Sequence, residues 1–139
     1  MSVRTAIHEQ GGLYFITFTC YKWLSLFDMV DAYDIVYNQF DYLKKEGHYI
    51  PGYVIMPNHV HFLIGFVNTG KSINARIGTL KRFMAYAIVE RLRNAGRVDT
   101  LKILTEGVND TDKKRGKLHE VFEPSFDAKK MFFAKNDGG

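Results

Sequence analysis

The sequence contains little cysteine, little proline and no long apolar run. A single cysteine, Cys20, cannot form an internal disulfide, which excludes a small disulfide-framed secreted protein. Three prolines in 139 residues, of which 46% are hydrophobic and 14% aromatic, exclude collagen-like repetition and general disorder. No stretch of about 18 apolar residues is present, and residues 1–12 lack the apolar segment of a signal peptide. We therefore expect one domain over residues 1–139, in the cytoplasm and without membrane association.

Positive charge is concentrated in the middle of the chain. Residues 71–117 contain twelve Lys and Arg against five Asp and Glu, whereas residues 1–70 and 118–139 are slightly acidic. Because cations that neutralise phosphates release counterions, this asymmetry favours a polyanionic partner such as nucleic acid. Solvated helices are also often basic, so charge alone leaves the partner open.

Alternating apolar residues predict three strands. Residues 13–20 alternate and are rich in aromatic and β-branched side chains, which suits a strand. Two apolar runs, 49–56 and 59–67, are separated only by Pro57-Asn58, a tight-turn signal. These two runs therefore predict a hairpin.

Helical spacing of apolar residues predicts two helices. One is expected to run from an Asp28 cap to about Glu46, and the other from a Ser72 cap to about Asn94. A further apolar segment at 121–126 would add a last strand. This order predicts an α+β protein of the ferredoxin-like βαββαβ type, with an antiparallel sheet and helices on one face.

The remaining segments carry weaker signals. Asp99 is expected to cap a short helix over 100–106, and residues 107–117 form a polar loop. The end of the chain, about residues 134–139, is expected to be a disordered or aberrant tail. Cys20 and Trp23 are expected to pack in the interior, and His48 to be solvated.

Two histidines stand side by side on the second strand of the predicted hairpin. A period of two places His59 and His61 on one face, and Val60 and Phe62 on the face that helices cover. Two neutral imidazoles at this spacing can bind one divalent ion. The alternative is a pair of surface histidines on a half-solvated sheet, so the sequence context has to decide.

That context is GYVIMPNHVHFLIGF, residues 52–66. It resembles the HUH-type single-tyrosine transposases, in particular the REP-associated tyrosine transposases and their bacterial insertion-sequence relatives. Their hallmark is His, a bulky hydrophobic residue and His after a Pro-Asn or Pro-Glu turn, which His59-Val60-His61 matches. The segments GGLYFITFTC, SINARIGTLKRFMAYAIVERLR and GKLHEVFEPSF also match, so the resemblance covers about residues 10–127.

The resemblance implies a specific activity. The family cleaves single-stranded DNA near an imperfect hairpin: a tyrosine attacks the scissile phosphate, which gives a 5′-phosphotyrosine bond and a free 3′-hydroxyl. It also implies that His59 and His61 hold a divalent metal ion, Mn²⁺ or Mg²⁺, because a phenol with a pKa near roughly 10 is a poor nucleophile at neutral pH. Members often work as homodimers and sometimes as monomers.

The chain departs from this family in one respect. The family carries its catalytic tyrosine on a helix after the segment that VFEPSF resembles, whereas no tyrosine follows Tyr86 here. We therefore expect a truncated or frame-shifted copy without its nucleophile and third metal ligand, and enzymatic activity of this chain is uncertain. The alternative function is a non-catalytic remnant that binds single-stranded nucleic acid. An interaction module of the same fold without a DNA role is a third hypothesis.

The second helix supplies the remaining candidates. Tyr86 is the one alternative nucleophile, because a helical wheel places it opposite the apolar stripe, between Arg82 and Arg93. The helix should cover the sheet face away from the histidines, so a solvent-facing or DNA-contacting tyrosine is the competing interpretation. Arg76, Lys81, Arg82 and Arg93 are predicted to follow a phosphate backbone, with solubility as the alternative role.

Overall fold

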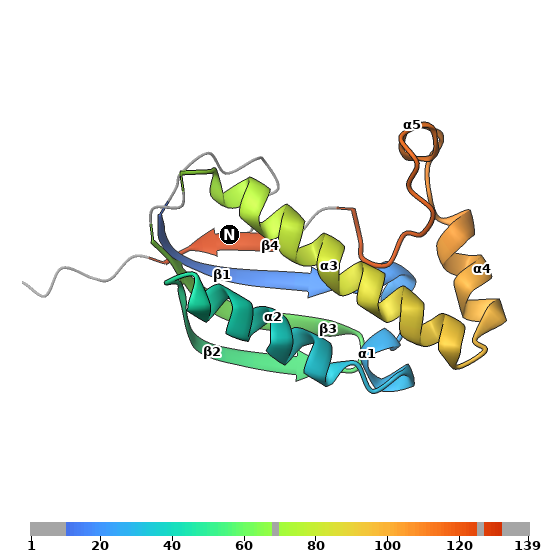
Figure 1. Ribbon diagram of the computed structural model, residues 1–139, viewed down its shortest axis with the longest axis horizontal. Coiled ribbons are helices and arrows are strands. Elements are labelled where there is room, and N and C mark those ends of the chain that lie inside the picture. Colours follow the sequence, from blue (N-terminus) through green and yellow to red (C-terminus); the bar gives the residue numbers. More distant parts are fainter. Residues whose placement is uncertain (1–10, 68–69, 125–126, 132–139) are drawn as a thin grey trace, which may run out of the picture.

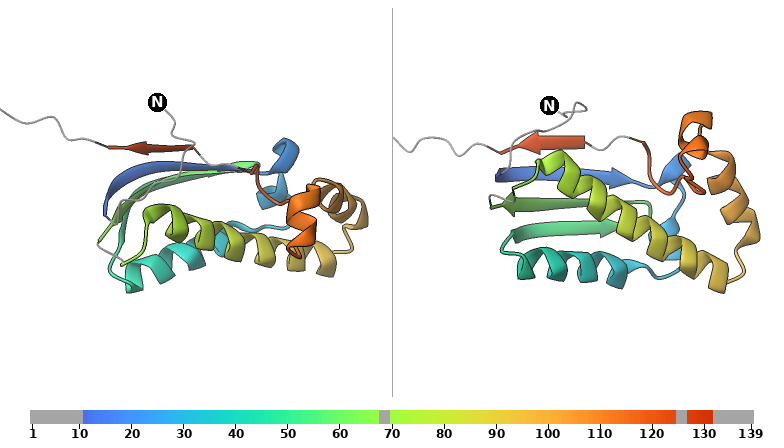
Figure 2. Two further views of the ribbon diagram at one scale, coloured as in Figure 1. Left: turned by 90° about the horizontal axis from the view of Figure 1, so that it is seen from above. Right: turned by 45° about the horizontal axis from the view of Figure 1, so that its top comes forward.

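A four-stranded antiparallel sheet carries its helices on one face (Figures 1 and 2). The computed structural model describes residues 11–67, 70–124 and 127–131. The strands are β1 (Gly12–Thr19), β2 (Tyr49–Met56), β3 (His59–Phe66) and β4 (Asp127–Lys130), in the spatial order β2-β3-β1-β4. This arrangement confirms the predicted α+β fold with the βαββαβ order of its main elements.

The β2–β3 hairpin forms as the sequence predicts. Pro57 and Asn58 make the turn, and Met56 pairs with His59 directly beside it. Further along, the register shifts between Tyr49 and Gly52, and Tyr49 pairs with Gly65. The ring of Tyr49 lies over Gly65, where an added Cβ would overlap it. Glycine is needed here for the close approach of a ring and not for a turn.

The two long helices lie side by side on the sheet (Figure 2). They are α2 (Tyr33–Lys45) and α3 (Ile73–Asn94). The hydroxyl of Ser72 accepts a hydrogen bond of 3.2 Å from the backbone N–H of Ala75, which confirms the predicted cap of α3. The apolar stripe of α3 is fully buried and packs on the strands.

The prediction that Asp28 caps one continuous helix is wrong. A short helix, α1 (Leu26–Met29), ends first, and α2 begins after Ala32. Between them Asp31 adopts a left-handed φ of 49°, which interrupts the helical backbone. The carboxylate of Asp28 instead accepts from the hydroxyl of Tyr33 at 3.5 Å.

The segments after α3 differ from the predictions in detail. Helix α4 (Val98–Glu106) begins at Val98 and Arg97 precedes it, so Asp99 lies in its first turn and is not its cap. The predicted loop at 107–117 contains a short helix, α5 (Asp110–Lys114), because the Asn109 side chain accepts from the N–H of Asp112 at 2.8 Å.

The predicted last strand lies further along the chain than 121–126. In that segment Phe122 makes only an isolated bridge to Cys20, and Pro124 has no N–H to continue a ladder. Pairing with β1 resumes at β4. The predicted tail at 134–139 lies outside the described residues.

One apolar core fills the space between the sheet and the helices. It comprises Tyr14, Ile16 and Phe18 of β1, Val60, Phe62 and Ile64 of β3, and the inward stripes of α2 and α3. Burying such a side chain contributes about 1.5–3 kcal/mol. Within the described residues, no helix has the length and apolar character that a membrane span requires.

Candidate functional site

The two histidines lie together on the open face of the sheet. His59 and His61 are half-buried, whereas Val60 and Phe62 between and beside them are buried on the helix side. The imidazole centroids are 4.7 Å apart, with an angle of 75° between the rings. The strand therefore presents both rings on one surface, as the alternation predicts.

Each histidine has a hydrogen-bond partner at Nδ1. The Nδ1 of His59 lies 2.7 Å from Oδ1 of Asn58, an acceptor, which in a neutral ring favours the tautomer with its proton on Nδ1 and the lone pair on Nε2. The Nδ1 of His61 lies 2.8 Å from the hydroxyl of Thr17, which allows the same tautomer. A partner of this kind fixes the orientation of a metal-binding imidazole. The sequence prediction did not include Thr17 and Asn58.

This pair has the chemistry of half a metal site. The pKa of His61 is lowered by burial and by the neighbouring His59, which favours the neutral, metal-binding form. Two imidazole nitrogens with open positions for oxygen suit Mn²⁺, and Mg²⁺ through phosphate oxygens. Among the residues that the structure describes, no group of three His, Cys, Asp or Glu could hold an ion, so the described side chains fit as two ligands only.

Two further rings extend the pair into a row. The ring of Trp23 meets His59 edge-on at 6.2 Å, and Phe15 stacks on His61 at 5.4 Å with an interplanar angle of 16°. The expectation that Trp23 packs in the interior is wrong, because 64% of its surface is exposed. Cys20 is buried as expected, and burial raises the pKa of its thiol to about 12.

The exposure of Trp23 follows from an unusual turn. Lys22 and Trp23 have φ angles of 53° and 59°, both in the left-handed region, within the 3₁₀ turn η1 (Tyr21–Trp23). Such a conformation costs about 1–2 kcal/mol for each non-glycine residue. The carboxylate of Glu123 stabilises the turn by accepting from the N–H of Lys22 at 2.9 Å.

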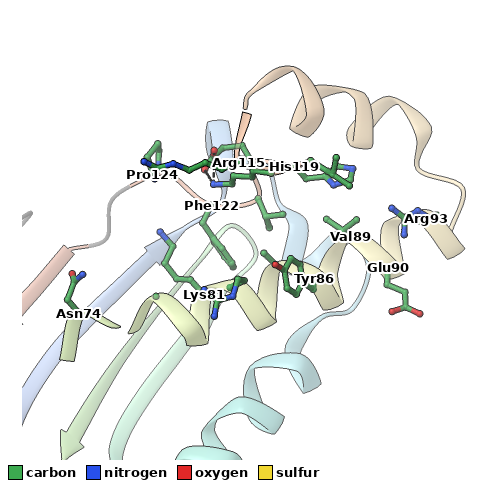
Figure 3. A pocket seen from close by; sticks show the side chains of 18 residues that line it. Asn74, Lys81, Tyr86, Val89, Glu90, Arg93, Arg115, His119, Phe122 and Pro124 are labelled. Carbon is green, nitrogen blue, oxygen red and sulfur yellow. Dashed lines mark hydrogen bonds and ion pairs between the residues drawn. The ribbon is translucent and has the colours of Figure 1, made fainter. Parts of the chain in front are cut away.

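A basic groove lies on the other side of the molecule, along α3 (Figure 3). It has a volume of about 900 Å³ and runs between α3 and residues 115–124. Its cationic lining consists of Lys81, Arg82, Arg93, Arg115 and Lys117, with His119 beside them. The carboxylates of Glu90 and Glu120 also line it, and Glu120 pairs with Lys117 at 3.0 Å. The groove therefore has more positive than negative side chains.

Lys81 is the least exposed cation of this groove. Its Nζ donates to the carbonyl of Glu123 at 2.9 Å and lies 5.6 Å from the ring centroid of Phe18. Burial lowers the pKa of Lys81 to about 8, which the carboxylate of Glu120 partly opposes. The charge of Lys81 therefore changes just above neutral pH.

Arg76 is separated from the other three predicted DNA contacts. It forms an ion pair with Glu46, and its Nη2 lies 3.4 Å from Nε2 of His48. The expectation that His48 is solvated is wrong, because this ring is buried and accepts from the N–H of Val67 at 3.1 Å. Burial and Arg76 lower the pKa of His48. Of the four predicted residues, only Lys81, Arg82 and Arg93 line the groove.

Tyr86 lies in the groove and not beside the histidines. Its side chain is 63% exposed on α3, and Figure 3 shows it next to Lys81 and Val89. Because α3 covers the face of the sheet opposite His59 and His61, the sheet stands between the phenol and the pair. Within one chain, this position suits contact with a ligand of the groove.

The sequence matches no protein-family model and no curated protein. Two solved structures are similar in fold. The first is a REP-associated tyrosine transposase bound to a REP hairpin: TM-score 0.59, 15% identity, covering 98% of this chain and 66% of that one. The second is a candidate transposase from Deinococcus radiodurans: TM-score 0.54, 14% identity, covering 92% of this chain and 83% of that one. The chain thus has the fold of these transposase structures and spans just under two thirds of the length of the first.

Proposed function

We propose that this chain is a transposase-type domain that binds single-stranded hairpin DNA and holds a divalent metal ion, Mn²⁺ or Mg²⁺, through His59 and His61. The observation that carries the proposal is the histidine pair on the open face of β3, with both Nδ1 atoms engaged by Asn58 and Thr17. The fold likeness to a REP-associated tyrosine transposase supports it.

In the proposed reaction a tyrosine oxygen attacks a backbone phosphate of the single strand. The new bond is a 5′-phosphotyrosine ester, and the bond to the 3′-oxygen breaks to leave a 3′-hydroxyl. A metal ion at the pair would stabilise the negative charge that develops on the phosphate. Thr17 and Asn58 would fix the orientation of the His61 and His59 rings that hold the ion.

The chain's own tyrosines limit what it can do alone. Among the described residues, the rings in contact with the pair are Trp23 and Phe15, and Tyr86 is on the helix side of the sheet. No tyrosine is therefore among these ring contacts of the pair, and the covalent step needs a tyrosine that reaches the pair from another position or from another chain. This observation favours, as a second candidate function, a DNA-binding protein of the same fold without covalent chemistry.

The basic groove supplies the contact with the DNA backbone in both functions. Lys81, Arg82 and Arg93 present cations from one helix, and Tyr86 adds an exposed ring between them. Cations next to an exposed ring suit a phosphate backbone and its bases. A DNA hairpin is the natural probe, because the similar solved transposase is bound to one.

Calorimetric titration with Mn²⁺ tests the metal assignment. We expect the wild type to bind one ion and the double variant His59→Ala, His61→Ala to bind none, with its fold intact by circular dichroism. His119→Ala is the matched control, because His119 is similarly half-exposed but lines the groove. Equal Mn²⁺ binding by the double variant would contradict the assignment.

A trapping assay separates the two candidate functions. The protein is incubated with a hairpin that carries single-stranded flanks and Mn²⁺, and adducts are sought on a denaturing gel and by mass spectrometry. An adduct mapped to a tyrosine supports the transposase reaction, and its loss in Tyr86→Phe would identify that residue. Hairpin binding without an adduct supports the second function. Sedimentation of the complex distinguishes a monomer from a homodimer.

A further inference from the structure

We infer that Trp23 stacks on an unpaired nucleobase of the bound strand, directly beside the histidine pair. This inference rests on the proposed function and adds to it a subsite for a base on the open face of the sheet. The observations that carry it are the exposure of Trp23, the way its turn is held, the row of rings that it begins and the cations at the ends of that row.

Trp23 is held in an exposed position by contacts from distant parts of the chain. The N–H of Cys20 donates to the carbonyl of Asn58 at 2.9 Å, and the N–H of Tyr21 donates to the carbonyl of Val121 at 2.8 Å. Glu123 accepts from the N–H of Lys22. These bonds maintain two consecutive left-handed residues, and the result is a large apolar ring that is 64% exposed. Backbone strain of this kind is concentrated at ligand-binding sites.

The four rings on the open face touch in sequence. Trp23, His59, His61 and Phe15 follow one another with centroid separations of 6.2, 4.7 and 5.4 Å. The two outer members are exposed, Phe15 by 37%. Exposed rings on the open face of a four-stranded sheet are a known means of binding unpaired bases. Trp23 offers the larger and more exposed of the two outer rings.

Cations lie at both ends of this row. The exposed Lys129 pairs with Phe15 across β1 and β4, and the exposed Lys22, whose Nζ lies 5.7 Å from the ring centroid of Tyr21, directly precedes Trp23 in the turn. A single strand that places a base on Trp23 would therefore bring its phosphates near a positive charge. Flanking lysines favour a nucleic acid over an apolar protein partner, although Val54 and Met56 are also exposed on this face.

The chain has one tryptophan, so its fluorescence reports on this position alone. The experiment compares a dT oligonucleotide with an abasic strand that has the same number of phosphates, in EDTA so that no metal contributes. We expect dT to quench Trp23 fluorescence and to bind roughly 5- to 100-fold more tightly than the abasic strand. Trp23→Ala should lose most of this preference for dT, with affinity measured by anisotropy of labelled DNA.

Two further variants test whether an aromatic ring is needed at position 23 and whether an exposed ring elsewhere has the same effect. Trp23→Phe keeps a stacking ring and should retain most of the preference for dT. Tyr42→Ala removes a ring that is 50% exposed on α2, on the helix side, and should bind dT as the wild type does. Circular dichroism melting of each variant verifies that it folds.

The outcomes separate this inference from the function on which it rests. Equal binding of dT and abasic strands by the wild type overturns the stacking and leaves DNA binding intact. A preference for dT that is undiminished in Trp23→Ala places the stacking elsewhere and also overturns it. Binding of neither strand overturns the stacking, and the hairpin of the trapping assay then shows whether DNA binding fails with it.

Discussion

The two sides of β3 have opposite chemistry, although their residues alternate along the same strand. Val60, Phe62 and Ile64 are buried under the helices, whereas His59 and His61 lie half-buried on the open face. The covered side contributes the burial on which the fold depends. The open side is stabilised by only a few hydrogen bonds and ring contacts, so its residues can serve binding with little cost to the fold. Alternate residues of β3 therefore stabilise the fold and form the candidate site.

The largest effect should come from the covered side. We expect Phe62→Ala to lower the free energy of unfolding by about 3–5 kcal/mol, because it leaves a cavity in the core next to Phe18 and Phe40. Phe15→Ala, on the open face of the neighbouring strand, should cost about 1 kcal/mol or less. Urea denaturation measures both, and similar losses would contradict the division between the two sides.

A substitution on β1 beside His61 should affect metal binding without affecting the fold. Thr17→Val removes the partner of His61 Nδ1, so we expect Mn²⁺ affinity to fall about 10- to 100-fold with little change in melting temperature. Thr17→Ser keeps the hydroxyl and should restore the affinity. Titration of the three proteins with Mn²⁺ tests this, and unchanged affinity in Thr17→Val would show that Thr17 does not position the ring.

The salt dependence of DNA binding at the groove should change with pH, which would not happen if all its cations were arginines. The pKa of Lys81 is lowered to about 8, so this side chain loses its charge as the pH rises from 7 to 9. We expect the slope of log affinity for a hairpin against log salt to decrease in magnitude by about one over this range. Lys81→Arg, which stays charged, should have a constant slope. The same slope change in both proteins would contradict the prediction.

The lowered pKa of Lys81 also determines whether the stability of the fold increases or decreases with pH. Between about 8 and 10.5 the folded chain binds fewer protons at Lys81 than the unfolded chain does. Stability should therefore increase with pH across this window as far as Lys81 contributes. Comparison with Lys81→Arg isolates that contribution from those of the neighbouring Glu120, Glu123 and Lys117.

The smallest effect is expected for a cation of α3 that lies outside the groove. Arg91 makes a two-pronged ion pair with Asp34 and donates to the carbonyl of Asp31 at 2.7 Å, which joins α3 to α2. Because both partners of the pair are partly exposed, Arg91→Ala should lower the free energy of unfolding by about 1 kcal/mol or less. DNA affinity measured alongside should not change. A loss comparable with that of Arg93→Ala would mean that the groove is not the binding surface.

Periodicity allowed the central features to be predicted. The alternation in residues 59–67 placed the histidines opposite the apolar side chains, and Ser72 before a helical stripe located the start of α3. These features depend on neighbours within a few residues, which a sequence displays directly. The fold class followed from the order of such local elements.

Features that depend on distant contacts could not be predicted. Trp23 is exposed because Val121 and Glu123 hold its turn, and nothing near position 23 in the sequence indicates this. Arg76 was predicted to bind DNA with the other cations of α3, yet it lies on the flank of α3 that faces α2, where Glu46 from the end of α2 pairs with it. In both cases the partner is brought into contact only by the tertiary fold.

The contact between Tyr49 and Gly65 bears on how this sequence can vary. The ring occupies the space that any side chain at position 65 would need, while its own exposure lets it move away. A relative with alanine or a larger residue at position 65 must therefore displace the ring from the sheet or have a smaller residue at position 49. Positions 49 and 65 are therefore expected to change together among relatives. Such covariation would indicate that the register of β2 against β3 is kept even where the rest of the sequence has diverged.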